Sequence, residues 1–258
     1  MDVANLFGDA LKYPTQDFNK VLILGLLSVI GVIPIFILAI LPLIFPTVGV
    51  IGASLTLIVI VTILLGALLS LIYSGYGLNI IKNTLALDSR PPEFDWGLIL
   101  IDGLKVWVLG IIYSLIPAIL YGVFFLLMMG SFTAANSANV GAIMIGNFIF
   151  LAILGIVSVI FELLYIVAIG KFAETDDLGA AANMIDVFHK IGEIGWGNFI
   201  LWLIVIWIIF MVISVVVGIL AFTVIGILIV GLLGLPYIMM FTFRALGLLY
   251  NESRTTTY

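Results

Sequence analysis

The chain has 258 residues, of which 64% are hydrophobic and only 9% are charged. Because soluble domains carry about 25% charged residues, this composition excludes a soluble globular domain. The net charge of −5, the lack of cysteine and the single histidine, His189, argue against nucleic-acid binding, thiol chemistry and a histidine metal cluster. We therefore expect no cofactor, no metal site and no nucleic-acid partner.

The start of the chain predicts a short amphipathic helix followed by a membrane span. Apolar side chains recur at helical spacing over residues 3–13, and the opposite face carries charged and amide side chains. Pro14 ends this segment, which we expect to lie in the membrane interface. The apolar run over residues 21–45 is long enough to cross a bilayer as a helix.

The second expected span, residues 51–81, carries a stripe of small residues. They recur at four-residue spacing and comprise Thr62, Gly66, Ser70 and Ser74. Small side chains in such a stripe let a neighbouring helix approach closely, so we expect a helix-packing face here. A polar connection follows, and a third span is expected over residues 104–129.

The second half of the chain predicts three more spans and another interfacial helix. The spans are expected over residues 142–170, 198–219 and 224–246. Between the first two of them, residues 178–192 predict an amphipathic helix whose apolar face is formed by Ala181, Met184, Ile185, Phe188 and Ile191. The fold class is therefore an all-α integral membrane protein, with one transmembrane domain over residues 1–258 and six transmembrane helices arranged as three hairpins. Aromatic and basic residues at the ends of the even-numbered spans fit either a repeated hairpin or an ordinary aromatic belt.

The basic residues predict an orientation. With six spans, the connections at 46–51, 130–141 and 218–226 share one side and contain no charged residue. All Lys and Arg fall on the other side, namely Lys12, Lys20, Lys82, Arg90, Lys105, Lys171, Lys190, Arg244 and Arg254. The positive-inside rule then predicts a cell-membrane protein with both termini in the cytoplasm.

The polar connection after the second span carries specific motifs. They are Lys82-Asn83-Thr84-Leu85, Pro92-Glu93-Phe94-Asp95-Trp96 and Asp102-Gly103-Leu104-Lys105. This pattern resembles the signature of a family of archaeal, often methanogen, multi-pass membrane proteins known only as a domain of unknown function. The segments 10–14 and 244–247 also look similar to that family. The resemblance implies the fold and an archaeal membrane, and it carries no activity over to this chain.

Glu162 is the only charged residue in the interior of an expected span, because Lys105 and Arg244 lie at the ends of theirs. Nine residues separate it from Lys171, so it lies about 13 Å deeper along the helix. Acids within the membrane are costly and suggest a proton or cation step. We therefore consider Glu162, with Ser158 and Tyr165 on the same helix, a candidate site of protonation or polar contact. The alternative is a neutral acid that hydrogen-bonds a neighbouring helix and only joins the two helices.

Two functional interpretations follow from these features. The first is a non-catalytic membrane scaffold that binds lipids of the bilayer or a partner protein at its cytoplasmic face. The alternative is a small transporter or channel in which Glu162 is the protonatable group. The chain contains no phosphate-binding loop and no nucleophile elbow, so we do not expect an enzyme. Substrate, partner and oligomeric state stay open.

Overall fold

The computed structural model describes residues 3–44, 48–134 and 140–255. Within these ranges the secondary structure is helical and contains no strand, which confirms the all-α fold class. The elements in chain order are α1 (Val3–Lys12), η1 (Tyr13–Gln16), α2 (Phe18–Ile44), α3 (Val48–Leu85), α4 (Trp96–Ala134), α5 (Val140–Thr175), α6 (Leu178–Ala182), α7 (Met184–Ile194), α8 (Trp196–Leu220), α9 (Val224–Ile229), the π-helical η2 (Val230–Gly234) and α10 (Leu235–Thr255). The connections expected at 46–51 and 130–141 lie partly outside the described residues.

The described helices are long and apolar enough to make this a membrane-spanning protein. Five segments qualify as spans, namely Leu55–Leu85, Trp96–Ser131, Val140–Thr175, Trp196–Leu220 and Val224–Glu252. A sixth is counted if the pair Val3–Gln16 and Phe18–Pro34, which is bent by 78°, forms one span. The described residues therefore form five or six apolar helices of membrane-crossing length.

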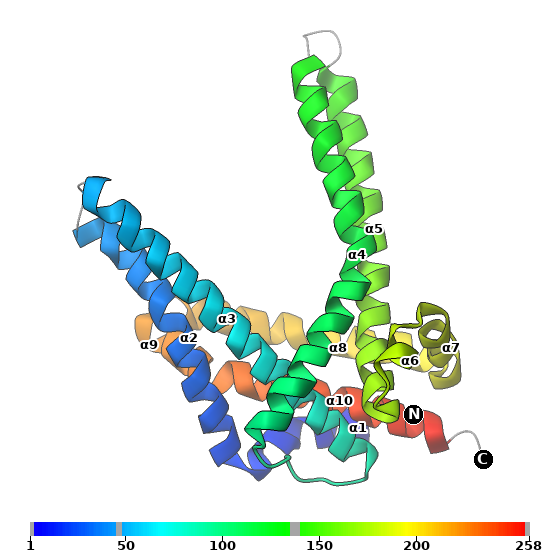
Figure 1. Ribbon diagram of the computed structural model, residues 1–258. Helices are drawn as coiled ribbons and strands as arrows, with labels where there is room; N and C mark the ends of the chain where they lie inside the picture. The colour runs from blue at the N-terminus through cyan, green and yellow to red at the C-terminus, as the bar shows by residue number, and fades with distance from the viewer. Residues whose placement is uncertain (1–2, 45–47, 135–139, 256–258) are drawn as a thin grey trace. The chain divides into compact units, whose positions relative to one another are not determined.

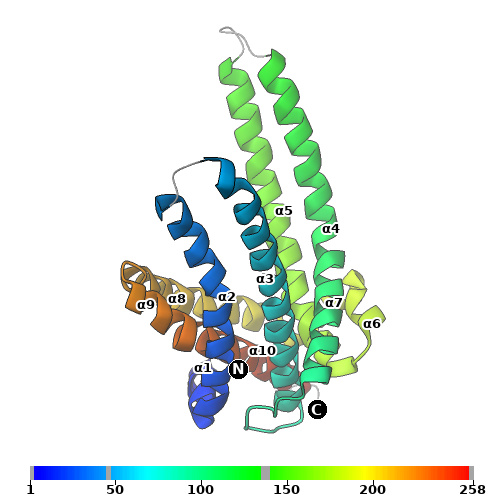
Figure 2. The same ribbon diagram turned by 60° about the vertical axis from the view of Figure 1, so that its left-hand side comes forward.

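The chain divides into two compact units. One comprises Met1–Val106 with Ile191–Tyr258, and the other comprises Trp107–Lys190. In the first unit, α2 and α3 run side by side as a hairpin, and α10 packs against both (Figures 1 and 2). Their shared core contains Tyr13, Val21, Leu24, Ile72, Tyr76, Ile80, Ile99, Met239 and Met240.

The apolar face of α1 is covered by protein. Its side chains Leu6, Phe7 and Ala10 are buried, and the Phe7 ring lies 6.3 Å from that of Phe241 on α10. The sequence pattern predicted the amphipathic helix but could not distinguish a face that meets lipid from one that packs on another helix. Here the second case holds for these three side chains.

In the first unit, α3 and α4 make a close helix contact through glycines. A Cβ on Gly75 of α3 would overlap the carbonyl oxygen of Ile99, and a Cβ on Gly103 of α4 would overlap that of Leu71. Only glycine lets the two backbones approach this closely. By contrast, a Cβ on Gly66, within the predicted stripe, would meet no atom within 4 Å.

The other members of the stripe bond to their own helix. Thr62 Oγ1 donates to the Ile58 carbonyl, and Ser74 Oγ donates to the Ser70 carbonyl. Such bonds satisfy a hydroxyl in an apolar environment without a neighbouring helix. The helix-packing role of Thr62, Gly66, Ser70 and Ser74 stays a prediction.

The residues expected to form one helix over 178–192 form two. Asp177 caps α6 by accepting from the amides of Gly179 and Ala180, and Asn183 interrupts the helix with an extended backbone. The Asn183 side-chain oxygen then accepts from the amide of Ile185, in the first turn of α7. Asp and Asn side chains compete with the helical backbone for hydrogen bonds in this way, which explains the break.

The last two apolar segments are joined by a tight turn. α8 ends at Leu220, and Thr223 caps α9 by accepting from the amide of Gly226, 2.9 Å away. A Cβ on Gly226 would overlap the Leu220 carbonyl oxygen, so the turn requires glycine here.

Candidate functional site

Glu162 lies on α5 in the second unit, with its side chain exposed. Among the residues that the structure describes, no hydrogen bond or ion pair involves its carboxylate. It lines a cavity of about 270 Å³ together with Gly110, Tyr113, Ser114, Pro117, Ser158, Phe161 and Tyr165. All of these residues belong to α4 or α5, which run side by side in Figures 1 and 2. The cavity is therefore built within one helical hairpin.

The cavity brings together the three residues selected from the sequence. Ser158 and Tyr165 line it beside Glu162, as their helical spacing on α5 requires. The Ser158 hydroxyl donates to the Leu154 carbonyl at 2.8 Å, and its oxygen lies 3.3 Å from Tyr121 Oη on α4, within hydrogen-bond distance. Ser158 thus connects the two helices through its hydroxyl, and the structure gives no bond from it to Glu162.

The α4 wall of the cavity was not predicted from the sequence. Pro117 has no amide hydrogen, so the Tyr113 carbonyl, one helical turn earlier, lacks its usual helical donor. The Tyr113 and Tyr165 rings lie 6.1 Å apart, tilted by 43°. A Cβ on Gly110 would lie 3.2 Å from the Tyr165 hydroxyl, so the small residue leaves room for that side chain. Proline inside an apolar helix with a tyrosine four residues earlier is the sequence signal that marks this wall.

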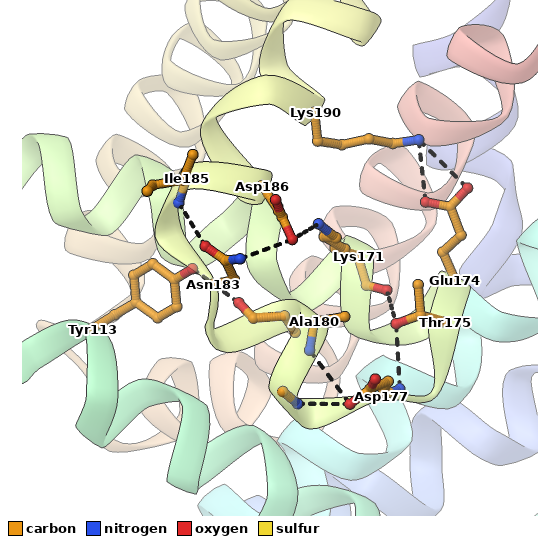
Figure 3. Close-up of polar contacts among 12 residues, drawn as sticks. Tyr113, Lys171, Glu174, Thr175, Asp177, Ala180, Asn183, Ile185, Asp186 and Lys190 are labelled. Atoms are coloured by element: carbon orange, nitrogen blue, oxygen red, sulfur yellow. Dashed lines mark hydrogen bonds and ion pairs between the residues drawn. The ribbon is translucent and has the colours of Figure 1, made fainter.

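Tyr113 also connects the cavity to the short helix α6. Its buried hydroxyl donates to the Ala181 carbonyl at 2.9 Å, a contact drawn in Figure 3. A buried tyrosine hydroxyl needs such a partner, and the bond fixes the ring. One wall of the cavity is therefore held in place by α6.

Ion pairs hold α7 against the end of α5 (Figure 3). Lys171 Nζ lies 3.6 Å from Asp186 Oδ2, and Lys190 Nζ lies 3.1 Å from Glu174 Oε2. Asn183 also donates to Asp186, at 2.9 Å. The Lys190 and Glu174 side chains are only 12% and 20% exposed, so this pair is shielded from solvent more than ordinary surface pairs.

The apolar face expected over residues 178–192 is divided between two environments, and its first member, Ala181, lies on α6. Ala181 and Ile191 are buried, whereas Ile185 and Phe188 are 70% and 54% exposed. Val187, which the sequence analysis did not include, is buried as well. The helix thus packs through one side and leaves two large apolar side chains outward.

A second polar cluster surrounds Arg244 in the first unit. Its guanidinium pairs with Asp9 at 2.9 Å, donates to Thr84 Oγ1 at 3.1 Å and to the Asp88 carbonyl at 2.8 Å, and lies 4.8 Å from the Tyr13 ring centroid. The Arg244 side chain is only 7% exposed. This cluster joins α1, α3 and α10 with the connection after α3, and sequence reasoning did not find it.

The loop after α3 is held by Lys20 and Tyr76. Lys20 Nζ donates to the Pro91 carbonyl and to Glu93, both at 2.8 Å. Tyr76 Oη donates to the Pro92 carbonyl at 3.1 Å, and its ring stacks on that of Phe94 at 4.8 Å. Lys20 and Tyr76, which lie outside the motifs, therefore anchor the loop backbone, and the motif residues Glu93 and Phe94 add side-chain contacts.

Asp102 is buried between two lysines. Its side chain is 1% exposed and lies 3.2 Å from Lys82 Nζ and 3.7 Å from Lys105 Nζ. In the part of the chain that the structure describes, no group of three or more His, Cys, Asp or Glu side chains is placed to hold a metal ion. The acids of this region instead pair with cations of the chain.

Residues 55–222 match the model of a family described as a protein of unknown function, DUF4013. The chain belongs to this family. No curated protein and no solved structure matches it. The resemblance noted in the 82–105 motifs is thus confirmed for a family of unknown function.

The matched region of this DUF4013 member includes the Glu162 cavity and the Lys82–Asp102 ion pair. By contrast, Asp9 and Arg244 lie outside it. The Arg244 cluster is thus completed by segments that precede and follow the matched region.

Proposed function

We propose that this membrane protein is a non-catalytic scaffold whose charged end binds membrane lipid or a partner protein. One observation supports this most directly. The buried charged residues Lys20, Asp102 and Arg244 all pair with groups of the same chain around the connection after α3. These three buried charges thus stabilise the ends of the helices. In this proposal, binding takes place on the outer surface, away from them.

The orientation is part of this proposal. The positive-inside rule favours a cytoplasmic location for the end that carries the Lys and Arg residues, together with both termini. The resemblance of the 82–105 motifs favours the cell membrane of an archaeon. The bound surface would then face the cytoplasm.

Helix α7 offers the surface best suited to such binding. Ile185 and Phe188 point outward, while Asp186 and Lys190 on other sides are engaged with α5. A helix with this distribution suits the boundary between lipid headgroups and acyl chains. We propose that Ile185 and Phe188 insert at that boundary and hold α6 and α7 on the membrane surface.

Spin labels test this placement, and the cysteine-free chain makes single-cysteine labelling clean. For labels at Ile185→Cys and Phe188→Cys, we expect oxygen, which concentrates in lipid, to increase the spin relaxation rate more than a water-soluble nickel chelate does. A label at Glu193→Cys, an exposed position away from both side chains, provides the matched control and is expected to show the reverse order. If the nickel chelate increases the relaxation rate more than oxygen does at all three positions, Ile185 and Phe188 do not insert into lipid.

A small transporter or channel is the second candidate function. It is favoured by Glu162, which lines a cavity beside a proline-interrupted helix. Proline kinks and intramembrane acids recur along ion pathways. Flux measurements separate this candidate from the scaffold.

A further inference from the structure

In its apolar environment, an ionised Glu162 carboxylate needs a positively charged partner. The residue lies within the apolar span Val140–Thr175, about 13 Å along the helix from Lys171. An ionised carboxylate in hydrocarbon is costly unless it is paired. Within the described ranges, no cation of the chain lies within ion-pair distance of it, and its side chain is exposed at the edge of the cavity.

The walls of the cavity are those of a site for an organic cation. Phe161 and the tilted pair Tyr113 and Tyr165 supply aromatic rings, whose faces attract ammonium groups. Ser114 and Ser158 supply hydroxyls. Because Tyr113 is fixed by its bond to Ala181, this part of the cavity exists before any ligand binds.

The same composition disfavours an inorganic cation. Calcium requires six to eight oxygen ligands, and magnesium requires a near-octahedral oxygen shell. This cavity has one carboxylate, and most of its lining residues are apolar or aromatic. The volume of about 270 Å³ is near the lower end for small-molecule pockets, which limits the ligand to a small one.

We propose that the cavity between α4 and α5 binds a small organic cation of the alkylammonium class. Glu162 neutralises the ammonium charge, and the rings of Tyr113 and Tyr165 contact the alkyl groups. This site is independent of the surface on α7, so a failure of one proposal leaves the other standing.

Choline and its uncharged isostere 3,3-dimethyl-1-butanol provide a direct test with the purified full chain in detergent. We expect choline to bind and the isostere, which has the same shape without the charge, to bind at least about tenfold more weakly. Glu162→Gln, which keeps the shape of the side chain, is expected to weaken choline binding by about tenfold or more. Equilibrium dialysis gives the dissociation constants.

A second pair of variants keeps the test decisive if Glu162→Gln fails to fold. Ser114→Phe fills the cavity, whereas Val123→Phe adds the same ring on the opposite side of α4, outside the cavity. Only Ser114→Phe is expected to abolish choline binding, with thermal unfolding confirming that both variants fold. The proposal is overturned if the wild type does not bind choline, or if it binds choline and the isostere equally. It is also overturned if Ser114→Phe binds choline as well as the wild type does, or if equimolar sodium displaces choline.

Discussion

Replacing Arg244 by methionine is expected to lower the free energy of unfolding by about 3 kcal/mol. Breaking a buried ion pair costs about 3–5 kcal/mol when the remaining charge stays buried. Asp9 is 40% exposed and can regain water, so the lower end of that range applies. Thr84 and the Asp88 carbonyl also lose a charged donor. Denaturant titration in detergent micelles measures the change.

Two further substitutions make the Arg244 result specific. Lys12→Met removes an exposed charge and should change stability by no more than about 0.5 kcal/mol. Arg244→Lys keeps the charge but loses the planar fork that reaches Asp9 and Thr84 together, so we expect an intermediate loss. If Arg244→Met and Lys12→Met have equal effects, the cluster does not brace the fold.

The glycine contact between α3 and α4 gives the second large effect. Gly75→Ala and Gly103→Ala would each place a methyl group onto a backbone carbonyl of the other helix, so the helices must separate. Overpacking of this kind costs about 1–3 kcal/mol, and we expect the upper end because backbone atoms cannot rotate away. Thermal unfolding in detergent is the measurement.

Gly66→Ala is the matched control on the same helix. A Cβ at Gly66 meets no atom within 4 Å, and alanine forms helix better than glycine by about 1 kcal/mol. We therefore expect unchanged or slightly raised stability. If Gly66→Ala lowers the stability as much as Gly75→Ala does, the close contact between the α3 and α4 backbones is not at Gly75.

Composition and hydropathy were sufficient for the fold class but not for the packing. Continuous apolar runs can only be membrane helices when charge is this scarce, so the all-α class followed from the sequence. The sequence pattern selected Gly66 as a packing position and did not select Gly75, yet of these two only Gly75 meets a neighbouring backbone. The difference depends on which positions of α3 face α4, and the spacing of residues along the sequence does not contain that information.

The two polar sites differ in how far the sequence revealed them. Glu162 was visible because a charge inside an apolar run is exceptional, while its aromatic wall comes from α4 and required the hairpin geometry. Arg244, Asp9 and Thr84 come from three distant segments. Each looks like an ordinary residue at a membrane boundary, so only the fold reveals that they form one cluster.

Proton and cation flux into liposomes that contain the purified protein tests the scaffold proposal most directly. The wild type and Glu162→Gln are compared with protein-free liposomes under a proton gradient and a potassium diffusion potential, and an added ionophore confirms that the vesicles are sealed. We predict that both proteins give only the protein-free rate, because the scaffold has no conduction role and the cation site binds without transport. Wild-type flux well above that rate, abolished in Glu162→Gln, would contradict the scaffold and establish Glu162 as the centre of a transport pathway.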